Sequence, residues 1–138
     1  MTSSTLARVS IAVDLVQLRA TIEELDRAPY LLTVSDDGRA HSVAVAWQWH
    51  DDEITCAVGN RTLANASTSP QVTLLWAPNH ADGYSLIVDA TVTATSGDGT
   101  GDNLVRLQPT RAVLHRPAPD GATLAPGCGA DCIPLTAR

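Results

Sequence analysis

Residues 30–76 read YLLTVSDDGRAHSVAVAWQWHDDEITCAVGNRTLANASTSPQVTLLW. Residues 30–35 have the composition of a strand, and apolar side chains alternate with polar or small ones from Val43 to Trp49, the period of a strand with one buried face. Asp37-Gly38 lies between these segments and is typical of a tight hairpin turn. A second turn at Asp51-Asp52 leads to another apolar segment, residues 53–58. The stretch therefore predicts three successive antiparallel strands.

A short helix is predicted directly after the third strand, over residues 62–67, and it ends before Pro70. The first backbone N–H groups of a helix lack carbonyl partners and carry partial positive charge, so they attract anions. Arg61 and Thr62 add a guanidinium and a hydroxyl at this helix start, which favours a phosphate ester as ligand. A solvated surface charge for Arg61 and a helix cap for Thr62 are the alternative interpretations.

The chain on both sides of this stretch extends the same fold class. Before it, an amphipathic helix is predicted because four leucine and isoleucine side chains recur at helical spacing: Leu15, Leu18, Ile22 and Leu25. After it, strands are predicted over residues 71–76, 84–96 and 104–115, with a bulge or an edge at Pro109. Six closely spaced strands and two short helices indicate a mainly β domain, most economically closed as a small barrel without free edges.

Length and composition predict one globular domain with a tail. The chain has 138 residues, enough for one domain with its own core. From Pro117 onward, proline, glycine and alanine dominate. We therefore expect a domain over residues 1–116 and a Pro/Gly-rich C-terminal tail over residues 117–138.

Charge and cysteine content exclude several classes of function. The net charge of −6 argues against a general nucleic-acid or anionic-membrane binder. No apolar run approaches the ~18 residues of a membrane span, and residues 1–12 show no secretory signal pattern. An odd number of cysteines, Cys56 with Cys128 and Cys132, is typical of a reducing compartment, and the tail pair lacks further metal ligands. We expect a cytoplasmic protein without a metal site.

The succession of three short segments resembles a known family. TVSDDGRAH at residues 33–41, WQWHDD at 47–52 and RTLAN at 61–65, followed by Pro70 and Val72, are similar to the pyridoxamine 5'-phosphate oxidase-like family of flavin-binding split barrels. The resemblance covers about residues 13–116 and lies in order and spacing. It implies a six-stranded antiparallel split β-barrel with an N-terminal helix and a short helix between strands 3 and 4. It also implies a homodimer with one flavin mononucleotide (FMN) in each of two clefts between the subunits.

The resemblance also assigns cofactor-binding residues. Arg61 and Thr62 correspond to phosphate-binding positions, and Asn65 lies nearby on the same helix. Ser42, Val43, Ala44 and Val45 correspond to the strand that runs along the isoalloxazine ring and offers backbone groups to its polar edge. Many family members have a second cation after the arginine, where this chain has Thr62. Loss of one charged hydrogen bond costs about 1.5–3 kcal/mol of phosphate binding.

These observations lead us to expect an FMN-dependent oxidoreductase that acts on a small molecule. The flavin supplies the hydride chemistry, so no catalytic side chain is required and none is predicted. Deazaflavin F420 is the alternative cofactor, although the chain lacks an additional basic groove for its oligoglutamyl tail. Because the family includes reductases, oxidases and heme-handling proteins, two other functions stay open. One is a binding module for flavin, F420 or heme without turnover, and the other is a cofactor-free dimeric split barrel.

Overall fold

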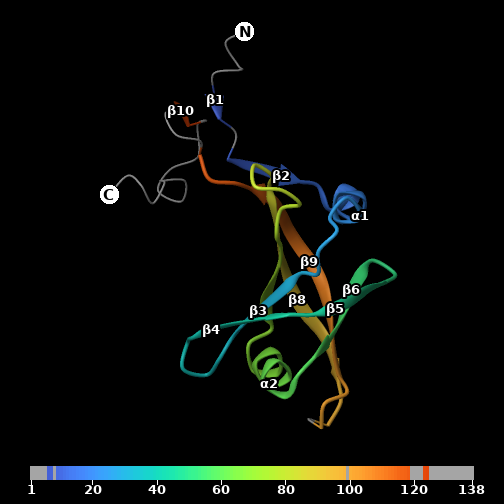
Figure 1. Ribbon diagram of the computed structural model, residues 1–138. Helices are drawn as coiled ribbons and strands as arrows, with labels where there is room; N and C mark the ends of the chain where they lie inside the picture. The colour runs from blue at the N-terminus through green and yellow to red at the C-terminus, as the bar shows by residue number, and fades with distance from the viewer. Residues whose placement is uncertain (1–5, 8, 99, 119–122, 125–138) are drawn as a thin grey trace.

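The structure, a computed structural model, describes residues 6–7, 9–98, 100–118 and 123–124. In this part of the chain a curled antiparallel sheet is accompanied by two helices (Figure 1). In chain order the elements are β1 Leu6–Ala7, β2 Ser10–Val13, α1 Leu15–Glu23, β3 Tyr30–Val34, β4 Ala40–Ala44, β5 Ala46–His50, β6 Glu53–Val58, α2 Asn60–Thr68, β7 Gln71–Trp76, β8 Ser85–Ser96, β9 Asn103–His115 and β10 Thr123–Leu124.

The main sheet curls until its two ends meet. Its strand order is β4-β3-β7-β8-β9-β6-β5, and β2 pairs with β9 outside this path. The two end strands, β4 and β5, are separated in sequence by Val45 alone. Ala44 lies opposite Tyr30 of β3, whereas Ala46 lies opposite Ala57 of β6. One bent segment therefore supplies both edge strands of the curled sheet.

The expected mainly β split barrel is confirmed, including a helix before β3 and a short helix between β6 and β7. The strand count differs, because the expected second strand is divided at Val45 and the described sheet path therefore has seven strands instead of six. Val45 is buried, and its N–H donates to the Pro29 carbonyl at 3.1 Å instead of to a neighbouring strand. The bulge expected near Pro109 is present, since pairing shifts register beside Ala90, the partner of Pro109.

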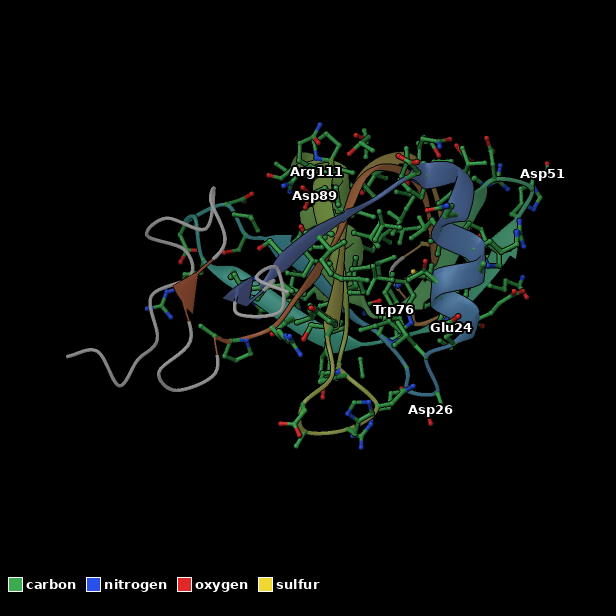
Figure 2. The ribbon with its side chains drawn as sticks, turned by 90° about the horizontal axis from the view of Figure 1, so that it is seen from above. Glu24, Asp26, Asp51, Trp76, Asp89 and Arg111 are labelled. Carbon is green, nitrogen blue, oxygen red and sulfur yellow. The ribbon has the colours of Figure 1, made fainter. Side chains whose placement is uncertain are left out.

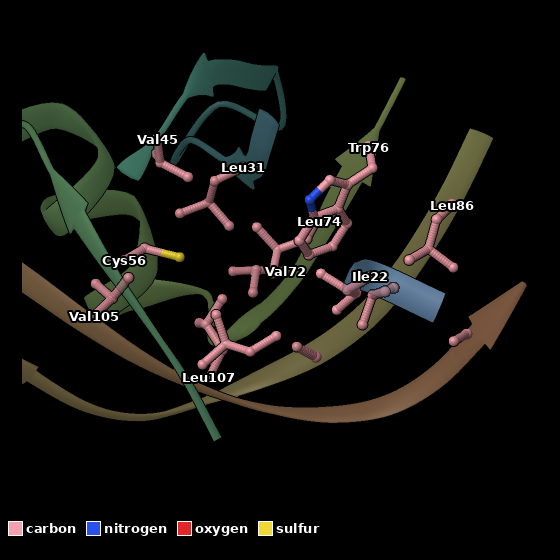
Figure 3. Packing of buried hydrophobic residues seen from close by; sticks show 14 of the residues in the cluster. Ile22, Leu31, Val45, Cys56, Val72, Leu74, Trp76, Leu86, Val105 and Leu107 are labelled. Carbon is pink, nitrogen blue, oxygen red and sulfur yellow. The ribbon is translucent and has the colours of Figure 1, made fainter. Parts of the chain in front are cut away.

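A single apolar core lies inside the curl and under α1 (Figure 3). Alternate side chains of β3 and β7 are buried, as the period of a strand requires. Figures 2 and 3 both place Trp76 of β7 on the side of the sheet that faces α1. From α1, Leu18 and Ile22 are each 2% exposed. Burial of each such side chain contributes about 1.5–3 kcal/mol, so the core holds the sheet and α1 in one arrangement.

The predicted tail, residues 117–138, lies almost entirely outside the described residues, and so do Cys128 and Cys132. Neither helix of the described chain combines the length and apolar character needed to span a membrane. Among the residues described, no three His, Cys, Asp or Glu side chains form a group that could hold a metal ion.

Candidate functional site

The start of α2 is open to an anion. Gly59 precedes the helix in an extended conformation, and no described side chain caps the helix. The first helical hydrogen bond runs from the Leu63 N–H to the Gly59 carbonyl at 3.0 Å, so the N–H groups of Asn60, Arg61 and Thr62 precede the helical ladder. The first turn contains no acidic residue. Its partial positive charge is therefore not neutralised from within the helix.

A cavity of about 250 Å³, here named the β4 cavity, lies between β4, the end of β6 and the start of α2. One side is apolar and belongs to the β4–β5 segment and the end of β6, whereas the other is the polar helix start. The lining residues are His41, Val43, Ala44, Val45, Ala57, Val58, Gly59, Asn60, Arg61 and Thr62. The cavity thus combines an apolar wall with free backbone N–H groups.

A larger cavity of about 810 Å³, here named the hairpin cavity, lies between the β3–β4 hairpin and α2. Most of its lining residues are polar or charged: Ser35, Asp36, Asp37, Arg39, Ala40, His41, Asn60, Arg61, Ala64, Asn65 and Thr68. His41, Asn60 and Arg61 line both cavities. Arg61 therefore stands where an apolar cavity and a polar cavity meet.

The structure brings five of the seven predicted cofactor-binding residues together around the β4 cavity. These residues are Arg61, Thr62, Val43, Ala44 and Val45. Arg61 is exposed and available to a ligand, but Thr62 is only 2% exposed and Val45 only 5%. Burial therefore limits what the last two residues can offer to a ligand.

The other two predicted residues lie elsewhere. Ser42 is exposed on β4 and lines neither cavity. Asn65 borders the hairpin cavity, but it is 7% exposed and its amide donates a hydrogen bond to Thr33 Oγ1 at 3.1 Å. Its side chain is thus engaged within the protein.

Several residues that line the cavities were not among the predicted cofactor-binding residues, and those with side chains suited to a polar ligand include Arg39, His41 and Asn60. A signal for the first two was present in the sequence, because His41 and Arg39 lie two and four positions before Val43 and therefore share its strand face. Asn60 is positioned from a distant strand, since Asn103 Nδ2 of β9 donates to its Oδ1 at 3.0 Å. No local pattern reveals that contact.

The positive charge of Arg61 acts on the hairpin. The pKa of Asp37 lies below its usual value, mainly because Ser35 Oγ donates a hydrogen bond to the carboxylate; the positive charge of Arg61 also contributes. Arg39 Nε lies 4.0 Å from Asp37 Oδ2. Two arginines and two aspartates therefore border the hairpin cavity, and the arginines together with the helix start can bind an anionic group.

Two mycobacterial proteins are similar to this chain over most of its length. The uncharacterized protein Mb0449c of Mycobacterium bovis is 40% identical over 134 residues, which are 88% of this chain and 93% of the relative. The uncharacterized protein MT0457 of Mycobacterium tuberculosis matches with the same identity and coverage. No protein-family model matches the chain.

Solved structures share its fold at low identity. An F420 reductase superposes with a TM-score of 0.55 at 14% identity, covering 67% of this chain and 93% of that one. A provisionally named pyridoxamine 5'-phosphate oxidase of Listeria innocua gives 0.58 at 11%, with 72% and 96% covered. An FMN-binding protein of Syntrophomonas wolfei gives 0.59 at 15%, with 76% and 88% covered. The chain therefore belongs to the family of the two mycobacterial proteins and has the split-barrel fold of pyridoxamine 5'-phosphate oxidase-like proteins.

Proposed function

We propose that the protein binds FMN and is a flavin-dependent oxidoreductase that acts on a small molecule. The observation that carries this proposal is the position of Arg61, at the uncapped start of α2 and between an apolar and a polar cavity. FMN has a flat apolar ring system at one end and a dianionic phosphate at the other. The two kinds of surface that meet at Arg61 match these two ends.

The phosphate end fits the helix start. The N–H groups of Asn60, Arg61 and Thr62 precede the helical ladder and can donate to phosphate oxygens, and the guanidinium of Arg61 can form charge-assisted hydrogen bonds. The nearby carboxylates belong to the hairpin and not to the helix. A phosphate at this place is therefore stabilised by both the helix dipole and a full positive charge.

The ring end fits the segment from Val43 to Val45. These residues supply apolar surface to the β4 cavity. At Val45 the chain leaves the regular ladder, because it passes from β4, which pairs with β3, to β5, which pairs with β6. The Val45 N–H is already bonded to the Pro29 carbonyl, so other backbone groups of this segment would have to meet the polar edge of the ring. The bound flavin would supply hydride transfer, while the residues of this chain orient the ring and exclude water.

FMN is proposed in preference to F420 because of charge. Of the solved structures described above, one is named for FMN and one for F420. Asp36 and Asp37 border the hairpin cavity beside Arg61, and their carboxylates repel an oligoglutamyl tail placed there. A single phosphate at the helix start brings fewer negative charges close to these carboxylates than an oligoglutamyl tail does.

We also propose that the protein is a homodimer whose flavin sites lie between the subunits. Tyr30 and Val34 are 46% and 40% exposed on β3, and their partners on β4 are Ala44 and Ala40. Ala44 also lines the β4 cavity, so this apolar outer face adjoins the proposed ring site. A partner subunit on this face would cover exposed apolar surface and enclose the cofactor.

Sedimentation equilibrium tests the dimer. We expect wild-type protein to be dimeric and Val34→Asp to be monomeric, because a carboxylate buried without a partner opposes association. Val16→Asp is the matched control, since Val16 is 94% exposed on α1, away from this face. A monomeric wild type, or a Val34→Asp variant that remains dimeric, would contradict the proposed interface. In this proposal the protein is cytoplasmic, where the free thiol of Cys56 stays reduced.

Titration with FMN, F420 and riboflavin tests the cofactor. We expect FMN to bind most tightly and Arg61→Ala to lower FMN affinity about tenfold to a hundredfold, the effect of one charged hydrogen bond. Arg27→Ala removes the same charge at an exposed position outside both cavities and should bind like wild type. Unchanged FMN affinity in Arg61→Ala would remove this arginine from the site.

Turnover distinguishes an enzyme from a binding module. Bound flavin that is reduced by NADH, NADPH or reduced F420 and reoxidised by an acceptor supports the oxidoreductase. Tight binding without reduction by any of these donors selects the non-catalytic module. A melting temperature that does not change with FMN selects the cofactor-free protein, because a ligand of the native state raises stability.

A further inference from the structure

The hairpin cavity contains arginines from two different elements. Arg61 belongs to the start of α2, and Arg39 lies at the end of the β3–β4 turn. They are 22 positions apart in sequence, and the fold places both in the lining of one cavity. The residue after Arg61 is Thr62, which is uncharged and only 2% exposed. At the start of the helix, a phosphate would therefore meet the positive charge of one side chain, that of Arg61.

The backbone of Arg39 is held in place by Ser35. The Ser35 N–H donates to the Arg39 carbonyl at 2.9 Å, and the Arg39 N–H donates to Ser35 Oγ at 3.3 Å. Gly38 completes the turn with a φ of +83°, which favours glycine. Arg39, His41 and Val43 alternate along the chain from this turn and thus share one face. Arg39 borders the hairpin cavity, Val43 borders the β4 cavity and His41 borders both, so this face connects the two cavities.

The side chain of Arg39 is free to change partners. Its ion pair with Asp37 is 4.0 Å long, and the two side chains are 86% and 69% exposed. Ion pairs between groups this exposed contribute little to stability because water screens them. A phosphate dianion in the cavity carries more charge than one carboxylate and offers three acceptor oxygens. Exchange of Asp37 for phosphate is therefore favourable for the guanidinium.

We infer that Arg39 is the second cation of the phosphate site, which holds the phosphate group of the flavin nucleotide between the β3–β4 hairpin and α2. This inference rests on the proposed function. It assigns to the hairpin the positive charge that is absent after Arg61. It also assigns a role to Asp37. The Asp37 carboxylate competes with the phosphate for Arg39, and its negative charge repels the phosphate.

Two substitutions with opposite expected effects on FMN affinity test the inference. Arg39→Ala should weaken FMN binding about three- to tenfold and leave riboflavin binding unchanged, because riboflavin lacks the phosphate. Asp37→Asn should strengthen FMN binding about two- to fivefold, since it removes a competing negative charge. Arg27→Ala again controls for net charge. The dependence of FMN affinity on salt should be shallower in Arg39→Ala than in wild type.

Other outcomes overturn the inference in distinguishable ways. Equal FMN affinity in Arg39→Ala and wild type excludes Arg39 from the site, and equal loss of FMN and riboflavin shows a disturbed hairpin instead of a lost charge contact. If Arg61→Ala weakens FMN binding and Arg39→Ala does not, the proposed function stands and this inference fails. If wild-type protein binds no FMN, both fail.

Discussion

Asn65 of α2 donates a hydrogen bond of 3.1 Å from its amide nitrogen to Thr33 Oγ1 of β3, and both side chains are buried. The two residues are 32 positions apart. The bond joins the helix to the first strand of the β3–β4 hairpin, the two elements that border the hairpin cavity. It therefore fixes the spacing between the start of α2 and the hairpin.

Loss of this bond should destabilise the fold. Asn65→Ala should lower the free energy of unfolding by about 1–3 kcal/mol, because a buried hydroxyl loses a hydrogen-bond partner. Urea unfolding of wild type, Asn65→Ala, Thr33→Val and the double variant measures the coupling. We expect the double variant to lose less than the sum of the single losses. Strict additivity would show that the two side chains do not stabilise each other.

The turn between β8 and β9 depends on glycine. Gly97 has a φ of +117°, and a Cβ atom there would clash with Asn103 Oδ1 and lie 2.8 Å from Asn103 Cα. Gly97→Ala should therefore cost more than Gly101→Ala, because Gly101 has a similar φ of +125° but no atom within 4 Å of its would-be Cβ. We expect about 1–3 kcal/mol for Gly101→Ala from backbone strain, and more for Gly97→Ala.

Thermal unfolding of the two glycine variants checks whether Gly97→Ala is the more destabilising of the two. A displaced Asn103 would also release Asn60, whose Oδ1 accepts a hydrogen bond from Asn103 Nδ2 at 3.0 Å. Gly97→Ala should then weaken FMN binding as well as stability, whereas Gly101→Ala should affect stability alone. Equal melting temperatures for the two variants would contradict the steric explanation.

Arg19 connects α1 to β5 and to the turn after it. Its guanidinium carbon lies 4.2 Å from the centroid of the Trp49 ring, and its Nη2 donates to the Asp51 carbonyl at 2.7 Å. Arg19→Ala should lower the free energy of unfolding by about 1–2 kcal/mol through the loss of both contacts. Arg19→Lys should lose less, because it keeps the charge but not the planar fork. Urea titration followed by tryptophan fluorescence provides the measurement, and a larger loss for lysine than for alanine would exclude this explanation.

Alkaline pH should reveal the buried thiol of Cys56. Burial raises the pKa of Cys56 from 9.0 to about 12. Above pH 9 the unfolded thiol releases its proton while the folded thiol keeps it, so the unfolded state is favoured as pH rises towards 12. The free energy of unfolding should fall by about 1.4 kcal/mol per pH unit in this window.

Cys56→Ala is the control for this pH dependence. The chain has no lysine, and every ionisable side chain except that of Cys56 is common to both proteins. The variant should show a shallower decline in stability than wild type over this range. Parallel declines would mean that the thiol of Cys56 is not protected by the fold.

Most of the regular elements could be predicted because they depend on local chemistry, although no strand was expected at β2, Ser10–Val13. Alternation from Val43 to Trp49, the Asp37-Gly38 turn and the helix start at Arg61 each reflect backbone geometry over a few residues. The same patterns predicted that Arg61 lies at the start of a helix, close to an apolar strand. These features require no knowledge of which strands are neighbours, and the structure contains each of them.

Contacts between residues far apart in sequence determined the features that these local patterns could not predict. Val45 bends because its two flanking strands pair with β3 and β6, and that division changed the strand count. Burial of Thr62 and Asn65, and the presence of Arg39 in the lining of a cavity with Arg61, depend on how α2 packs against the β3–β4 hairpin. The periodicity of side chains predicts which residues share a face of a helix or strand. The residues that this face contacts depend on how elements far apart in sequence pack together.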